Sequence, residues 1–305
     1  MPGYSPGYFA PDSVAVRVMS NRAVGLTYGQ RALIVGALNP RLYLGTMAHT
    51  HHRDTPYRRL MLTARLFETV FLGDRAEADR ALAFTRRRHA PVSGRLAEDA
   101  GPHHPAGTAY SAADPHLMFM TMAFAFDSVQ VMQELLVRRL TGTEREQLYQ
   151  DFVRWGELFG MPGSAAPADY PTFRAGFDAY LASDEVYLTD EARVVGSYLA
   201  GAKRGDYDVS LALRPLFRAM DVVVKGSLPA RVRTLYGFGW TARDRVSFPA
   251  VVTGTRALYR RPPRLAPRPL APVIKGRNGE LFKLVARAER RQLARGRLSM
   301  PEVAG

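Results

Sequence analysis

Residues 114–140, DPHLMFMTMAFAFDSVQVMQELLVRRL, contain the pattern that decides the fold class. Asp114 can accept hydrogen bonds from the free N–H groups at a helix start, and Pro115 suits the first helical position. Apolar side chains then recur three or four residues apart in two neighbouring stripes, which leaves little of the circumference polar. One stripe consists of Met118, Met122, Ala125, Val129, Met132 and Leu136. We therefore expect a long helix over 114–140 at the centre of the protein.

The rest of the chain repeats this helical periodicity, whereas the alternating β-branched runs that are typical of strands are sparse. Thr141 with Glu144, or Thr143 with Glu146, can form a capping box for the next helix. The Gly-, Ala- and Pro-rich segment 93–113 is expected to be a surface loop. Further helices are predicted at 12–20, 28–38, 56–72, 74–90, 143–160, 170–183, 188–200, 209–222, 244–258 and 278–294. We predict an all-α fold with a single mainly helical domain.

Composition excludes several classes of protein and site. The chain has 305 residues, of which 47% are hydrophobic, so it can bury a large core. It has no cysteine, which excludes disulfides, Cys-based zinc sites, Cys nucleophiles and thiolate-ligated haem. The start lacks the pattern of a signal peptide, and the longest apolar stretch, 117–126, is too short to span a bilayer. We expect a soluble, cytoplasmic protein without a transmembrane segment.

The positive charge is concentrated near the C-terminus. The formal net charge is +14, and the last 50 residues, with 13 basic and three acidic side chains, contribute +10 of it. This region includes the run RRPPRLAPRPLAP at 260–272, which is typical of an extended strap. We predict a helical domain over 1–255 and a basic C-terminal extension over 256–305. Because the body is nearly neutral, we expect no nucleic acid partner.

Histidine is the main candidate for metal chemistry in a chain without cysteine, and His89 is the best placed of the seven. It continues a helical stripe formed by Ala78, Leu82 and Thr85, so it is either a satisfied core residue or a ligand. Arg86 begins a run of three arginines just before it. Guanidinium groups there can bind the carboxylates of a bound molecule.

A second candidate site lies at residues 49–54, HTHHRD. His49, His51 and Asp54 could supply two imidazoles and a carboxylate to non-haem iron or zinc, provided the backbone points them the same way. The alternative is a polar loop that caps the following helix.

Arg59 and Thr63 are four residues apart, so they share a helix face with apolar neighbours. A polar pair on such a face costs desolvation unless it finds partners. One account is an internal ion pair between Arg59 and Asp114 or Asp127. The other is that Arg59 and Thr63 line a cofactor pocket.

From about Asp12 to about Trp240 the chain resembles the oxygenase MpaB family, whose relatives include the latex-clearing rubber oxygenases. Each landmark is short, and their shared order and spacing carry the resemblance. They are PDSVAVRV (11–18), TPYRRLMLT (55–63), FLGDRAEADRALAFTRRRHAPVSG (71–94), YSAADPHL (110–117), WGELFGMP (155–162) and YPTFRAGFDAYL (170–181).

The resemblance implies a mainly helical haem b protein with a globin-like haem-binding core. The family's Arg-x-x-His-Ala context places the axial iron ligand at His89. Its Arg and Thr, four apart on the preceding helix, match Arg59 and Thr63. A lysine that caps the iron in some rubber oxygenases falls at Leu62 here, so that capped state is not expected. His49 matches a histidine that could lie in the distal pocket.

The resemblance therefore implies a haem-dependent oxygenase. It would use O₂ or peroxide to oxidise a hydrophobic unsaturated or aromatic small molecule, as in natural-product tailoring. His89 would bind the iron, while Arg59, Thr63 and Arg86 would contact the oxidant or the haem propionates. Two alternatives stay open: a non-haem metalloenzyme using His49, His51 and Asp54, and a non-catalytic protein whose basic C-terminal segment binds a partner. The oligomeric state is left open.

Overall fold

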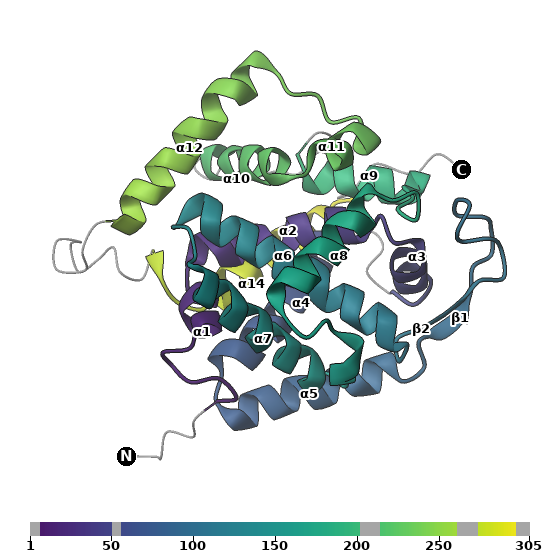
Figure 1. Ribbon diagram of the computed structural model, residues 1–305. Helices are drawn as coiled ribbons and strands as arrows, with labels where there is room; N and C mark the ends of the chain where they lie inside the picture. The colour runs from purple at the N-terminus through teal and green to yellow at the C-terminus, as the bar shows by residue number, and fades with distance from the viewer. Residues whose placement is uncertain (1–6, 51–55, 202–213, 261–273, 297–305) are drawn as a thin grey trace.

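Helix α6 (Pro115–Leu136) lies in the middle of an assembly of helices (Figure 1). The computed structural model describes residues 7–50, 56–201, 214–260 and 274–296. Within these ranges almost all regular structure is helical, which confirms the all-α prediction of a single mainly helical domain. The other helices are α1 (Val14–Met19), α2 (Arg22–Gly36), α3 (Pro40–Ala48), α4 (Pro56–Leu72), α5 (Arg75–His89), α7 (Gly142–Leu158), η1 (Gly163–Ala165), α8 (Tyr170–Ala182), α9 (Asp190–Leu199), α10 (Arg214–Ser227), α11 (Ala230–Tyr236), α12 (Ala242–Arg260) and α14 (Gly279–Ala294).

Helix α6 begins as predicted and ends earlier than predicted. The Asp114 carboxylate accepts hydrogen bonds from the N–H groups of His116 (2.9 Å) and Leu117 (3.2 Å), and Pro115 is the first helical residue. The predicted end at residue 140 is wrong, because the helix stops at Leu136. Arg256 of α12 reaches this end, where its Nε donates to the Leu135 carbonyl at 2.8 Å. A side chain from elsewhere in the protein thus satisfies carbonyl groups that a continued helix would have used.

The core forms where α6 meets α2, α7 and α8. Phe126 of α6 is fully buried, and its ring lies 5.5 Å from that of Phe152 and 5.0 Å from that of Phe173. These are ordinary separations for edge-to-face aromatic pairs, which add to the free energy of burial. Helix α7 begins with the Thr141–Glu144 capping box, one of the two that the sequence allowed. The prediction of α6 as the central helix is confirmed.

Some short elements lie where no element was predicted. Segment 93–113 contains a small antiparallel ribbon of β1 (Ser93–Arg95) and β2 (Ala109–Ser111), so the prediction of a loop was incomplete. Helices α3 and α11 were missed as well, because nine and seven residues show too little periodicity to stand out. The ribbon joins the end of α5 to the start of α6.

The C-terminal helix α14 packs along α4. Phe282 is buried, and the buried carboxylate of Glu289 accepts a hydrogen bond from the Arg58 N–H at 2.6 Å. Most basic side chains of α14 are exposed, as at Arg287 and Arg290, whereas Lys283 is half-buried. Most of the Pro-rich run 260–272 lies outside the described residues, and the predicted boundary at 255/256 stays a prediction. None of the described helices combines the length and hydropathy needed to cross a membrane.

Candidate functional site

Helices α4 and α5 form a hairpin whose turn is Gly73–Asp74. A Cβ atom at Gly73 would lie 2.5 Å from the Thr69 carbonyl oxygen, so the tight turn requires glycine. Asp74 then caps α5, because its carboxylate accepts from the Glu77 N–H at 2.7 Å while the Glu77 carboxylate accepts from the Asp74 N–H at 3.2 Å. The turn sets the direction of α5 relative to α4. The candidate site residues lie on these two helices, away from the turn.

His89 is the last residue of α5. The stripe that leads to it is buried at Ala78, Leu82 and Thr85, whereas His89 itself is exposed. The interpretation of His89 as a satisfied core residue is therefore wrong. No described residue forms a hydrogen bond or ion pair with its ring. Desolvation by the surrounding protein lowers the pKa of His89 below its ordinary value. The imidazole is thus largely neutral at pH 7, with a nitrogen lone pair available to a ligand.

Arg59 and Thr63 lie one turn apart on α4 and differ in exposure. Arg59 is half-buried, and its Nη1 donates to the Met47 sulfur at 3.2 Å. Burial lowers the pKa of Arg59. Thr63 is exposed, and so is Leu62, with 43% of its surface accessible. This face of α4 therefore presents a hydroxyl and an apolar side chain above a partly buried cation.

The proposed internal ion pair of Arg59 does not form. Asp114 binds Arg41 at 2.5 Å, and Asp127 binds Arg31 and Arg174, each at 2.5 Å. Both carboxylates are therefore already used by other arginines. Of the two accounts of Arg59, the structure removes the ion pair with Asp114 or Asp127.

The end of α5 carries further groups that suit an anionic, partly apolar ligand. Arg86 is exposed one turn before the helix end. Phe84 is 43% exposed, and the Arg88 guanidinium lies 5.6 Å from the centre of its ring. Exposed apolar side chains thus occur on both α4, at Leu62, and α5, at Phe84. Exposed apolar side chains of this size are consistent with a surface that a ligand covers.

His49 is the C-cap residue of α3 and is exposed. Its Nε2 lies 3.4 Å from the Tyr110 hydroxyl, and the two rings meet edge to face. Met47, the partner of Arg59, is two residues earlier, so the end of α3 lies close to the start of α4. Met47 and Tyr110 were not among the residues predicted from the sequence. Tyr110 starts the YSAADPHL landmark, which was the one available signal.

The metal cluster predicted at His49, His51 and Asp54 is not tested, because His51 and Asp54 lie outside the described residues. Among the described residues, no group of three or more His, Asp or Glu side chains could hold a metal ion. The arrangement that the structure does describe is the hairpin, with Arg59 and Thr63 on α4 and Arg86 and His89 on α5.

A protein-family model matches residues 16–257, a span that runs from within α1 to near the end of α12. No curated protein and no solved structure matches the chain significantly. The matched span includes the whole hairpin with Arg59, Thr63 and His89. Because the match covers well over half of the 305 residues, this chain belongs to the family described as "ER-bound oxygenase mpaB/B'/Rubber oxygenase, catalytic domain".

Proposed function

We propose that this oxygenase-family protein is a haem b enzyme in which His89 is the axial iron ligand. It would use O₂ or peroxide to oxidise a hydrophobic unsaturated or aromatic small molecule. The observation that carries the proposal is the state of His89. It is an exposed imidazole with a lowered pKa, at the end of a helix that packs against the helix of Arg59 and Thr63.

The residues of the hairpin fit a haem group. A haem needs an axial donor, an apolar surface for its ring and cations for its propionates. His89 is a neutral nitrogen donor, and Leu62 and Phe84 are exposed apolar side chains on the two helices. Arg86 is an exposed cation within one turn of His89. Imidazole is the expected donor because the chain has no cysteine thiolate to compete with it.

When bound, the haem iron would supply the activation of O₂ or peroxide. The role of the protein would be to bind the haem and to orient the oxidant. His89 would hold the iron through a ring nitrogen and set its electronic properties. The Arg59 guanidinium, fixed by its contact with Met47, and the Thr63 hydroxyl would donate hydrogen bonds to the oxidant or to a propionate. Leu62 would keep water away from this side and favour apolar substrates.

The test is haem binding by the full-length protein and two histidine variants. Wild type mixed with haemin should show a Soret band and bind one haem per chain. His89→Ala should weaken haem binding by more than about tenfold, because metal sites lose that much even when only supporting residues change. His116→Ala is the matched control, since His116 is also exposed and lies on another helix.

Two results would contradict the proposal. One is wild-type protein that gives no Soret band with haemin. The other is His89→Ala that keeps the wild-type band and haem content while folding normally. Equal losses in His89→Ala and His116→Ala would also count against a specific role for His89.

A further inference from the structure

A hollow lined by several cations lies at the end of α6, away from His89. It has a volume of about 330 Å³ and forms where α1, the loop after α6, the end of α12 and the segment before α14 meet. This volume is at the lower end of the range for small-molecule sites, about 300–1,000 Å³. Its lining combines apolar residues (Val14, Val18, Val137, Leu140), neutral polar residues (Asn21, Gln133, Tyr259) and cations (Arg17, Arg138, Arg260, Lys275).

An adjoining hollow extends this cationic surface. It shares Val137, Arg138 and Arg260 with the first and adds Arg139 and Arg256. Arg138 and Arg260 therefore lie at both hollows. We call the two hollows together the arginine cleft. Six cations of the described residues line it: Arg17, Arg138, Arg139, Arg256, Arg260 and Lys275.

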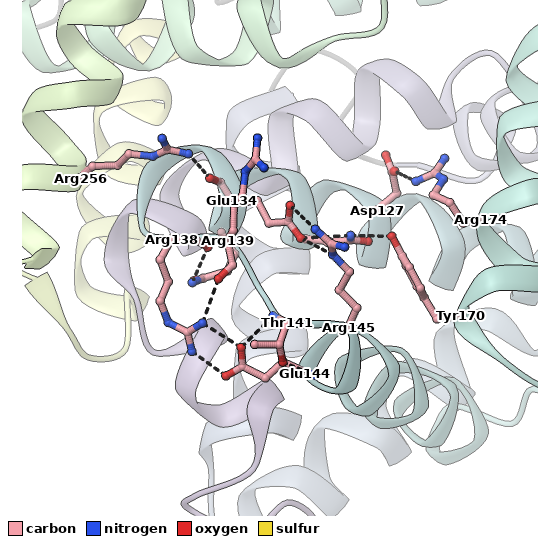
Figure 2. Close-up of polar contacts among 12 residues, drawn as sticks. Asp127, Glu134, Arg138, Arg139, Thr141, Glu144, Arg145, Tyr170, Arg174 and Arg256 are labelled. Carbon is pink, nitrogen blue, oxygen red and sulfur yellow. Dashed lines mark hydrogen bonds and ion pairs between the residues drawn. The ribbon is translucent and has the colours of Figure 1, made fainter.

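One carboxylate, that of Glu144, holds two of these cations in place. Its oxygens accept from Arg138 Nη1 (2.8 Å) and Nη2 (2.6 Å), and from Arg17 Nη2 (3.2 Å) (Figure 2 shows the pairing with Arg138). Hydrogen bonds from Arg138 lower the pKa of Glu144 to about 2, so Glu144 is ionised at neutral pH. It fixes the two guanidinium groups but neutralises only one charge.

The other cations of the cleft lack a carboxylate partner among the described residues. Arg256 donates to backbone carbonyls at the end of α6, as Figure 2 shows, and these neutral acceptors do not offset its charge. Arg260 and Lys275 are exposed, and no described side chain forms an ion pair with either. Arg139 likewise forms no ion pair with a described side chain. Like charges gathered around a hollow repel one another, and an anion placed among them relieves that repulsion.

We propose that the arginine cleft binds the phosphate group of a molecule that also has an apolar part. Guanidinium groups match phosphate oxygens in geometry and charge, and a doubly charged phosphate suits an excess of several cations better than a single carboxylate. Arg260 and Lys275 contact the phosphate, and the apolar part lies on Val18 and Leu140. The phosphate comes from a free organic phosphate or from a lipid headgroup.

This site is independent of the proposed haem site. The ribbon after His89 leads to the start of α6 (Figure 1). The arginine cleft is lined by residues at the other end of α6. A 22-residue helix is about 33 Å long. The cleft therefore binds its ligand without contacting a group held by His89, and either proposal can fail alone.

The first test is calorimetric titration of the full-length protein with phenyl phosphate and with inorganic phosphate at low salt. The double variant Arg260→Gln/Lys275→Gln removes two exposed cations of the cleft. The control Arg243→Gln/Arg245→Gln removes two exposed cations near the start of α12. We expect wild type and control to bind phenyl phosphate alike, and the cleft variant to bind at least about tenfold more weakly. Phenyl phosphate should bind more tightly than inorganic phosphate.

The second test identifies the source of the phosphate by sedimentation with vesicles of phosphatidylcholine, with and without phosphatidic acid. Binding that requires phosphatidic acid and is lost only in the cleft variant assigns a lipid headgroup. Phenyl phosphate binding without vesicle binding assigns a free organic phosphate. The proposal is overturned if wild type binds neither, if both double variants weaken binding equally, or if phenyl phosphate binds no better than inorganic phosphate.

Discussion

The stability of the core depends on the partners of one buried charge, the carboxylate of Asp127. Asp127 is buried on α6 and accepts from Arg31 of α2 and Arg174 of α8 (Figure 2 shows Arg174). Its desolvation is offset by the two arginines, and together these effects lower the pKa of Asp127. Because the folded-state pKa is depressed, this stabilisation is present above the ordinary pKa of the carboxyl and is lost as pH falls through the folded value.

Asp127→Asn should therefore lower the free energy of unfolding at pH 7 by about 3–5 kcal/mol, because it leaves Arg31 buried without its countercharge. Urea denaturation measures the change. Asp178→Asn is the control, since Asp178 pairs with the same Arg174 but its side chain is 65% exposed. It should cost no more than about 1 kcal/mol. Equal effects of the two substitutions would contradict this account of Asp127.

Helix α14 illustrates packing between elements that are distant in sequence. Glu68 of α4 is buried and accepts from the backbone N–H of Asn278 at 2.6 Å and from its side-chain amide at 3.2 Å. Burial raises the pKa of Glu68 despite these bonds. The folded state therefore binds its proton more tightly than the unfolded state. Wild type should lose stability as pH rises from the ordinary Glu pKa to the folded one.

Glu68→Gln removes this titration and keeps an oxygen acceptor for Asn278. The free energy of unfolding of Glu68→Gln should rise relative to that of wild type as pH increases from the ordinary Glu pKa to the folded-state pKa of Glu68. The rise should be at most about 1.4 kcal/mol per pH unit. Urea denaturation between pH 4 and 7 measures the difference. The exposed Glu98→Gln serves as control and should show no such trend. If the difference in free energy of unfolding between Glu68→Gln and wild type stays constant with pH, the raised pKa of Glu68 is contradicted.

The sequence was informative about elements with long periodic patterns and explicit caps. The start of α6 followed from Asp114 and Pro115, and the start of α7 followed from Thr141 and Glu144. The end of α6 could not be predicted, because Arg256, 120 residues further along, satisfies its last carbonyls. The packing of α14 on α4 could not be predicted either, because it depends on contacts between residues more than 200 positions apart in the sequence, such as Glu68 with Asn278.

At the scale of the whole molecule, His89 and the arginine cleft lie near opposite ends of α6. Resemblance to a family pointed to Arg59, Thr63 and His89, and helical spacing placed the first two on one face. The exposure of His89 could not be predicted from the helical stripe of Ala78, Leu82 and Thr85, because α5 ends at His89 and this end of the helix lies outside the core. The cleft was also beyond sequence reasoning, because it joins Arg17, Arg138 and Lys275 from three distant segments.

The central claim, that His89 binds haem iron, is tested most directly by chemical rescue. His89→Gly leaves room for a free imidazole at the position of the lost ring. Mixed with haemin, this variant should show a weakened, shifted Soret band, and added imidazole should restore the wild-type spectrum and haem content. His116→Gly should need no rescue. A His89→Gly protein that keeps the wild-type spectrum without imidazole would contradict the claim.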